Sequence, residues 1–167
     1  ILANQISIDL ITTNDIHGVV NKQTAYFMNP EYPPTIIGGA GFYKYLSELK
    51  KDENINTLIL DGGNFFQGSN FGMNDKGKSM VEWMNLLEYD VFVPGQYDFI
   101  FGVENLNDIL KNAKFSVVGS NLNCNNCIEN LKPYVIKEIE GVKVGILGIV
   151  NSEIPELVPN SKLNDIS

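Results

Sequence analysis

The chain has 167 residues, 44% of them hydrophobic and 19% charged, a composition typical of one globular domain and not of a disordered or fibrous chain. Its net charge of −8 argues against nucleic acid as a partner, because phosphate backbones are bound through clustered Lys and Arg. No apolar run approaches the roughly 20 residues of a membrane span, so no transmembrane segment is expected.

The first part of the chain alternates strand and helix patterns. Residues 6–13 are rich in β-branched side chains and predict a buried strand. Residues 21–37 contain three prolines and predict an irregular insertion. The glycine-rich residues 38–41 then start a helix, and residues 56–60 predict a second buried strand.

The same alternation continues downstream. Ser79 is expected to cap a second helix, whose apolar face includes Met80, Trp83, Met84 and Leu87. Residues 90–93 predict a strand, residues 103–113 a third helix and residues 115–119 a further strand. Strands that alternate with helices favour a parallel α/β core.

The pattern changes near the C-terminal end. Two strand patterns, residues 134–139 and 142–150, flank Glu140-Gly141, which is typical of a tight hairpin turn. This late hairpin predicts that the sheet becomes mixed. The hairpin is apolar at alternate positions, so one of its faces needs a covering layer.

Three polar clusters directly follow predicted strands. They occupy residues 14–18, 61–64 and 95–102. Open α/β sheets bind ligands at the carboxyl ends of their strands, so these clusters predict a site. In the first cluster, Asp15 and His17 combine a carboxylate with an imidazole, a pair that suits Zn, Mn or Fe.

These motifs resemble those of the calcineurin-like metallophosphoesterases, in their 5′-nucleotidase and UDP-sugar hydrolase branch. That branch carries N-D-x-H-G, then D-x-G-D followed by x-x-Q-G, then G-N-H-E-F-D-x-G, matched here by residues 14–18, 61–68 and 95–102. The helix start at residues 38–41 and the stretch 132–148 are also similar. The resemblance implies an α/β fold: the N-terminal half of a four-layer α/β/β/α sandwich, with the whole chain 1–167 as a partial domain that continues beyond its C-terminus.

The departures from the pattern fall on the implied two-metal site. Asp15 and His17 match first-metal ligands, but Asn64 stands where a bridging Asp is expected and Gln96 where an Asn ligand is expected. Tyr97 replaces the His that stabilises the transferring phosphoryl group, and Ile100 replaces the Asp that orients that His. The sequence has one His in total, so the family's later His ligands are absent. The resemblance therefore implies a vestigial or partial metal site and no intact catalytic residues.

Simpler interpretations exist for each position. The two retained ligands are then a remnant of ancestry, and Asn64 forms a turn. Tyr97 packs against Phe99 and Phe101, and Asp98 caps the following turn. A divalent cofactor such as Mn or Zn is implied by the family, but the substitutions argue against it.

Cys124 and Cys127 form a Cys-Asn-Asn-Cys pattern in a polar loop. A redox motif would need a helix N-terminus to activate a thiol, and a zinc knuckle would need a second ligand pair. A local disulfide in an exported protein is the favoured interpretation. It agrees with the extracytoplasmic location (periplasmic, secreted or cell-surface) of this branch.

Three functions remain open. The chain is expected to be a non-catalytic family member that acts in binding or assembly. The alternative is a metal-dependent phosphohydrolase of nucleotides or nucleotide sugars, whose remaining ligands lie in a missing C-terminal half or in a partner chain. The third is a structural domain without a ligand. The expected partner is a second polypeptide, another copy of the chain or a missing C-terminal region, and not a nucleic acid.

Overall fold

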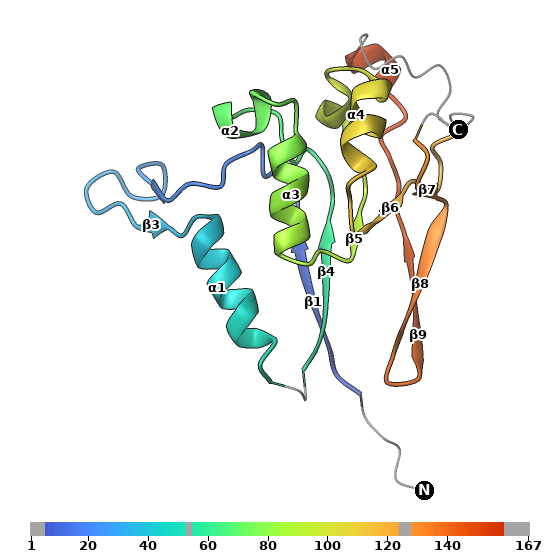
Figure 1. The fold of residues 1–167 in the computed structure, drawn as a ribbon. Coiled ribbons are helices and arrows are strands. Elements are labelled where there is room, and N and C mark those ends of the chain that lie inside the picture. Colours follow the sequence, from blue (N-terminus) through green and yellow to red (C-terminus); the bar gives the residue numbers. More distant parts are fainter. Residues whose placement is uncertain (1–5, 53–54, 124–127, 159–167) are drawn as a thin grey trace, which may run out of the picture.

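A computed structural model describes residues 6–52, 55–123 and 128–158. Its central element is a five-stranded sheet in the order β1-β4-β5-β6-β7, and every neighbouring pair in it is parallel (Figure 1). The strands are β1 (Ile8–Thr13), β4 (Asn56–Asp61), β5 (Val91–Phe92), β6 (Ser116–Val118) and β7 (Leu131–Lys132). The parallel α/β core predicted from the alternation of strand and helix patterns is therefore confirmed.

One face of this sheet is covered by helices. The three longest are α1 (Gly39–Leu49), α3 (Lys78–Leu86) and α4 (Val103–Leu110), and their apolar sides pack on the strand residues Ile59, Phe92 and Val117. The shorter elements are α2 (Asn70–Met73), the 3-10 turn η1 (Gln96–Phe99) and α5 (Ile154–Leu157). None of the helices in the described part of the chain is long and apolar enough to cross a membrane.

The opposite face carries the predicted hairpin, β8 (Tyr134–Ile139) and β9 (Val142–Leu147). Its inward residues Val135 and Ile146 pack on Leu58, Val91 and Val118 of the sheet. The hairpin forms its own two-stranded sheet, so the five-stranded sheet stays parallel throughout and does not become mixed. The reason is that the hairpin buries its apolar side against the face of the sheet. The helix, sheet and hairpin layers confirm the expected α/β class.

Local details differ from the sequence prediction at two points. Ser79 lies inside α3 and is not its cap: Gly77, with a φ of 102°, precedes the helix, and the Asp75 carboxylate accepts the Ser79 backbone N–H. The insertion at residues 21–37 is not wholly irregular, because β2 (Gln23–Thr24) pairs antiparallel with β3 (Thr35–Ile36). The predicted cysteine pair lies outside the described residues.

Candidate functional site

The three polar clusters meet at the carboxyl end of the parallel strands. The segment after β1 runs beside the segment after β4, with backbone hydrogen bonds from Asp15 to Gly63 (2.9 Å), from His17 to Asn64 (2.9 Å) and from Gly18 to Phe65 (2.8 Å). These bonds hold the two loops in register. The fold therefore brings these clusters to one edge of the sheet, as the sequence predicted.

Asp98 joins the second loop to the third. Its side chain is fully buried, and its carboxylate accepts the backbone N–H groups of Asn64 (2.7 Å), Phe65 (2.9 Å) and Gly95 (2.8 Å). Burial raises the pKa of Asp98 to about 7, although the three N–H donors favour its ionised form. Asp98 does act as a cap, but it caps the 3-10 turn η1 in which it lies, through the Gly95 N–H, and not the turn that follows it. Its other two bonds reach across to the loop after β4. In the sequence, the position of Asp98 between Tyr97 and Phe99 gave no indication of this role.

Asn64 forms hydrogen bonds through both the nitrogen and the oxygen of its side-chain amide. Its Nδ2 donates to Asp15 Oδ1 (2.8 Å), and its Oδ1 accepts the backbone N–H of Tyr97 (2.9 Å). Its backbone lies in the left-handed region with a φ of 58°, so it also shapes a turn. The hydrogen bonds from Asn64 and then from Asn14 lower the pKa of Asp15. The loops after β1, β4 and β5 are thus connected through one side chain.

His17 is held in a defined orientation. Its Nδ1 lies 2.9 Å from the carbonyl oxygen of Gln67, so Nδ1 is the donor in this contact, and in the neutral ring the lone pair is then on Nε2. Nε2 lies 3.7 Å from Asp15 Oδ1. The Tyr97 ring stands at 6.2 Å from the His17 ring, while Phe101 stacks on Phe66. Tyr97 therefore lies beside His17 at the site. The predicted packing of Tyr97 against Phe99 and Phe101 did not include this contact.

Two other predicted positions lie at the edge of this cluster. The Gln96 side-chain oxygen accepts a hydrogen bond from Asn151 (3.3 Å), a residue that follows the hairpin. Ile100 is partly buried and packs against the main core. Neither position provides a charged group to the site.

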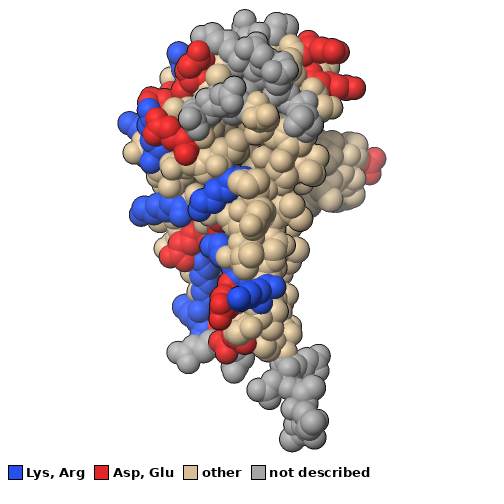
Figure 2. Space-filling view, turned by 90° about the vertical axis from the view of Figure 1, so that its right-hand side faces the viewer, with Lys and Arg blue, Asp and Glu red and all other residues tan. Residues whose placement is uncertain are grey.

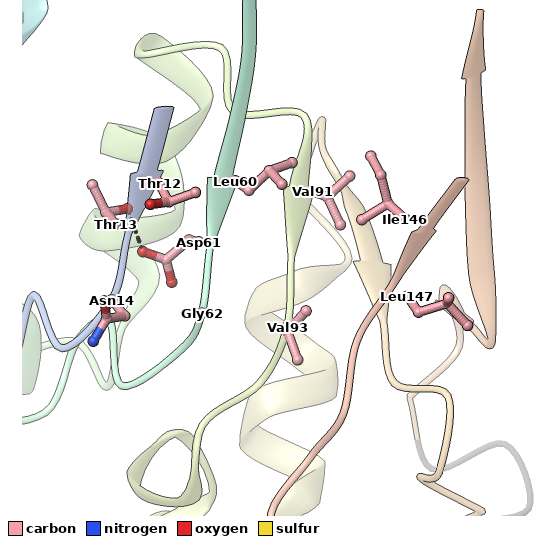
Figure 3. A pocket seen from close by; sticks show the side chains of 10 residues that line it. All are labelled: Thr12, Thr13, Asn14, Leu60, Asp61, Gly62, Val91, Val93, Ile146 and Leu147. Atoms are coloured by element: carbon pink, nitrogen blue, oxygen red, sulfur yellow. Dashed lines mark hydrogen bonds between the residues drawn. The ribbon is translucent and has the colours of Figure 1, made fainter. Parts of the chain in front are cut away.

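A cleft of about 440 Å³ opens next to the site, between the sheet and the hairpin (Figure 3). Leu60, Val91 and Val93 form its apolar floor, and Ile146 and Leu147 enter from β9. At its polar end lies Asp61, whose carboxylate accepts the Thr13 hydroxyl (2.6 Å) and the Gly63 N–H (2.8 Å). Thr13 in turn contacts the Tyr89 hydroxyl (2.8 Å).

Burial raises the pKa of Asp61 from its ordinary 3.8 to about 6. Because the folded chain binds this proton more tightly than the unfolded chain, Asp61 favours folding at low pH, and that contribution is lost as the pH rises through about 6.

We predict that Asp61→Asn stabilises the fold by about 3 kcal/mol at pH 7.5 and by about half of that at pH 5, as the size of the pKa change implies. The amide keeps the bond from Gly63 and can donate to Thr13, which then donates to Tyr89. Urea unfolding of parent and variant at both pH values measures the difference. A difference that does not change with pH would contradict this assignment.

Comparison with known proteins shows which proteins this chain is similar to. The chain is 29% identical to rat (Rattus norvegicus) 5′-nucleotidase over 162 residues, which cover 93% of this chain and 28% of that protein. It is 30% identical to the snake venom 5′-nucleotidase of Gloydius brevicauda over 164 residues, again 28% of that protein. The crystal structure of a 5′-nucleotidase precursor from Thermus thermophilus superposes with a TM-score of 0.76 at 26% identity, over 87% of this chain and 29% of that one.

The chain is similar to the N-terminal region of 5′-nucleotidases and shares the fold of a solved 5′-nucleotidase precursor. No protein-family model matches it. The 5′-nucleotidase-like chain spans less than a third of the length of these relatives. These matches confirm the suspected resemblance to the 5′-nucleotidase branch. The activity of the longer relatives is not carried over to this chain by the matches.

The 5′-nucleotidase-like chain fits the metal implied by its family only in part. His17 Nε2 lies 3.7 Å from Asp15 Oδ1, and the contact of Nδ1 with the Gln67 carbonyl leaves Nε2 on the side of Asp15. Asn64, however, presents its N–H₂ group to Asp15, and an N–H donor cannot coordinate a cation. Within the described residues, no group of three or more His, Cys, Asp and Glu side chains could hold an ion. The residues present therefore do not fit a two-metal centre.

Proposed function

We propose that this chain is a 5′-nucleotidase-like domain without phosphohydrolase activity, which acts in binding or assembly. The observation that carries the proposal is the pair Tyr97 and Ile100 at the positions where the family's pattern has a His and the Asp that orients it. Tyr97 offers a phenol and Ile100 offers no polar group, so neither can move a proton as an imidazole–carboxylate pair does. His17 is the one histidine of the sequence, and its Nδ1 is hydrogen-bonded to the Gln67 carbonyl.

We expect no hydrolysis of AMP or of a UDP-sugar above the buffer rate, with Mn²⁺ or Zn²⁺ present. Loss of an acid–base or electrostatic group lowers a rate by ~10²–10⁴, and here both kinds of group are changed. The rat 5′-nucleotidase, assayed in parallel, is the positive control. Turnover at ordinary enzyme rates of about 1–10³ per second, abolished by His17→Ala, would overturn the proposal.

One observation favours the alternative, a metal-dependent hydrolase completed by further residues. The His17 tautomer leaves Nε2 free, and Asp15 lies beside it, so half of a first metal site is formed in advance. A longer chain that contains the region matching the rest of the relatives would then hydrolyse AMP, whereas residues 1–167 alone would not. Tyr97 and Asn64 argue against this outcome, because no added segment replaces them.

We also propose that further polypeptide covers the hairpin side of the sheet. Leu10 on β1 is 60% exposed, and Leu147 and Ile149 at the end of the hairpin are 70% and 73% exposed. Figure 2 looks onto this side and shows a broad uncharged surface beside a band of charged side chains. A region equivalent to the rest of the longer relatives is the expected cover, since these relatives extend over more than three times the matched length. Part of the apolar lining of the cleft would be buried by the same contact.

The assembly proposal predicts that the isolated 167-residue chain is not a clean monomer. Apolar surface of this kind drives association in water, because its burial removes it from contact with solvent. Light scattering after size exclusion measures the mass, and binding of a hydrophobic dye reports the exposed surface. A variant with Leu147→Lys and Ile149→Lys should shift the chain toward the monomer. A monomeric parent that binds no dye would contradict the proposal, and a stable dimer would point to self-association as the cover.

The extracytoplasmic location is a further proposal, supported by relatives whose names place them in snake venom. Formation of the Cys124–Cys127 disulfide in protein recovered from an oxidising compartment would support it. Mass spectrometry without reduction decides whether two hydrogens are missing from the intact chain.

A further inference from the structure

The side chain of Asn64 stands where the family pattern has an Asp that bridges two metal ions. The resemblance implies that metal ions held by residues of the loops after β1, β4 and β5 would connect these loops. Here the amide makes the connection itself. Its Nδ2 donates to Asp15 in the first loop, and its Oδ1 accepts the Tyr97 N–H in the third.

The orientation of this amide follows from its neighbours. The backbone N–H of Tyr97 can only donate, so the atom that faces it must be the amide oxygen. The N–H₂ group then faces Asp15, whose pKa is lowered chiefly by this bond. A carboxylate at the same position would place a second negative charge 2.8 Å from the Asp15 oxygen unless a cation lay between them.

We infer that the Asn64 amide replaces the metal bridge, and that it ties the three loops of this site together without any ion. Two further hydrogen bonds support this connection between the loops. The Asn64 backbone N–H is fixed by the buried Asp98 carboxylate, and the Asn64 carbonyl accepts the His17 N–H. The side chain therefore projects from a backbone that is held on both sides, as a permanent connection requires.

The test compares thermal unfolding of the parent, Asn64→Asp and Asn64→Ala, each in EDTA and in about 1 mM Mn²⁺. The parent should unfold at the same temperature in both media. Asn64→Asp should unfold about 3–6 °C lower in EDTA and recover most of that loss in Mn²⁺, and a combined Asn64→Asp and Gln96→Asn variant should recover at least as much. Asn64→Ala loses both bonds and should be destabilised equally in the two media, which makes it the matched control.

Two results would overturn the inference. One is a parent chain that is destabilised by EDTA or stabilised by Mn²⁺ as strongly as Asn64→Asp. The other is an Asn64→Ala variant as stable as the parent, which would show that the amide connects nothing. Because the readout is stability, it is independent of the hydrolysis assay. Turnover with a metal-insensitive parent would reject the proposed function alone, and a metal-sensitive but inactive parent would reject this inference alone.

Discussion

Replacement of Asp98 by Ala should lower the free energy of unfolding by about 3–5 kcal/mol, because each buried donor left without a partner costs about 1–3 kcal/mol. The variant leaves three backbone N–H groups, those of Asn64, Phe65 and Gly95, without their acceptor. Removal of a desolvated carboxylate offsets part of the loss. Urea unfolding at pH 7.5 measures the change.

Asp90→Ala is the matched control for this effect. Its carboxylate also lies beside a parallel strand, accepts one backbone N–H from Ile59 (3.0 Å) and pairs with Lys137 on β8 (2.9 Å). Its loss should cost about 1–2 kcal/mol, since only one backbone donor is left unpaired. In ¹H–¹⁵N spectra, Asp98→Ala should shift the Tyr97 amide and the Asn64 side-chain signals, whereas Asp90→Ala should not. Equal losses, or unchanged site signals, would mean that Asp98 does not position these loops.

Gly63→Ala should be about as damaging, because the loops after β4 and β5 touch backbone to backbone at this residue. Gly63 has a φ of 98°, and a Cβ there would lie 2.1 Å from the Gly95 nitrogen and 2.7 Å from the Val93 oxygen. Backbone atoms in two hydrogen-bonded loops cannot shift without loss of those bonds. We expect a loss of at least about 3 kcal/mol, measured by the same unfolding experiment.

Gly141→Ala separates crowding from backbone strain. Gly141 in the hairpin turn has a similar positive φ of 80°, but a Cβ there would meet nothing within 4 Å. Its replacement should therefore cost only the conformational term, about 1 kcal/mol. The difference between the two glycines measures how closely the loops approach each other. Equal costs would show that the loops separate readily and that the site is not rigid.

These variants bear on function because the same contacts position Asn64 and, through it, Asp15. The backbone of Asn64 is fixed by Asp98, and its side chain orients Asp15 next to His17. A site built in this way is rigid without an ion, and it presents one carboxylate, one imidazole and one phenol to solvent. Phosphoryl transfer needs preorganised positive charge, and this is why the proposed function of the site is binding and not catalysis.

The sequence by itself was sufficient for the order of the longer helices and of most strands, and for the edge of the sheet where the polar clusters meet. Hydrophobic periodicity and turn residues are local, so helices α1, α3 and α4 and the hairpin β8–β9 could be predicted close to their observed bounds. The two-residue strand β7 was not predicted, because it is too short to show a period and forms only through pairing with β6.

The tertiary structure decided what the individual site residues do. Asp98 binds donors 33 and 34 residues away, and Asn64 reaches Asp15 across 49 positions, so no local pattern carries these bonds. The side of the sheet that receives the hairpin is likewise a matter of packing. The alternation of Val142, Val144 and Ile146 marks one apolar face of β9, and only the fold shows that this face meets Leu58, Val91 and Val118. Sequence motifs specify which groups are available at a site. Their hydrogen-bond partners, and with them their charge and orientation, are set by segments that only the folded chain brings together.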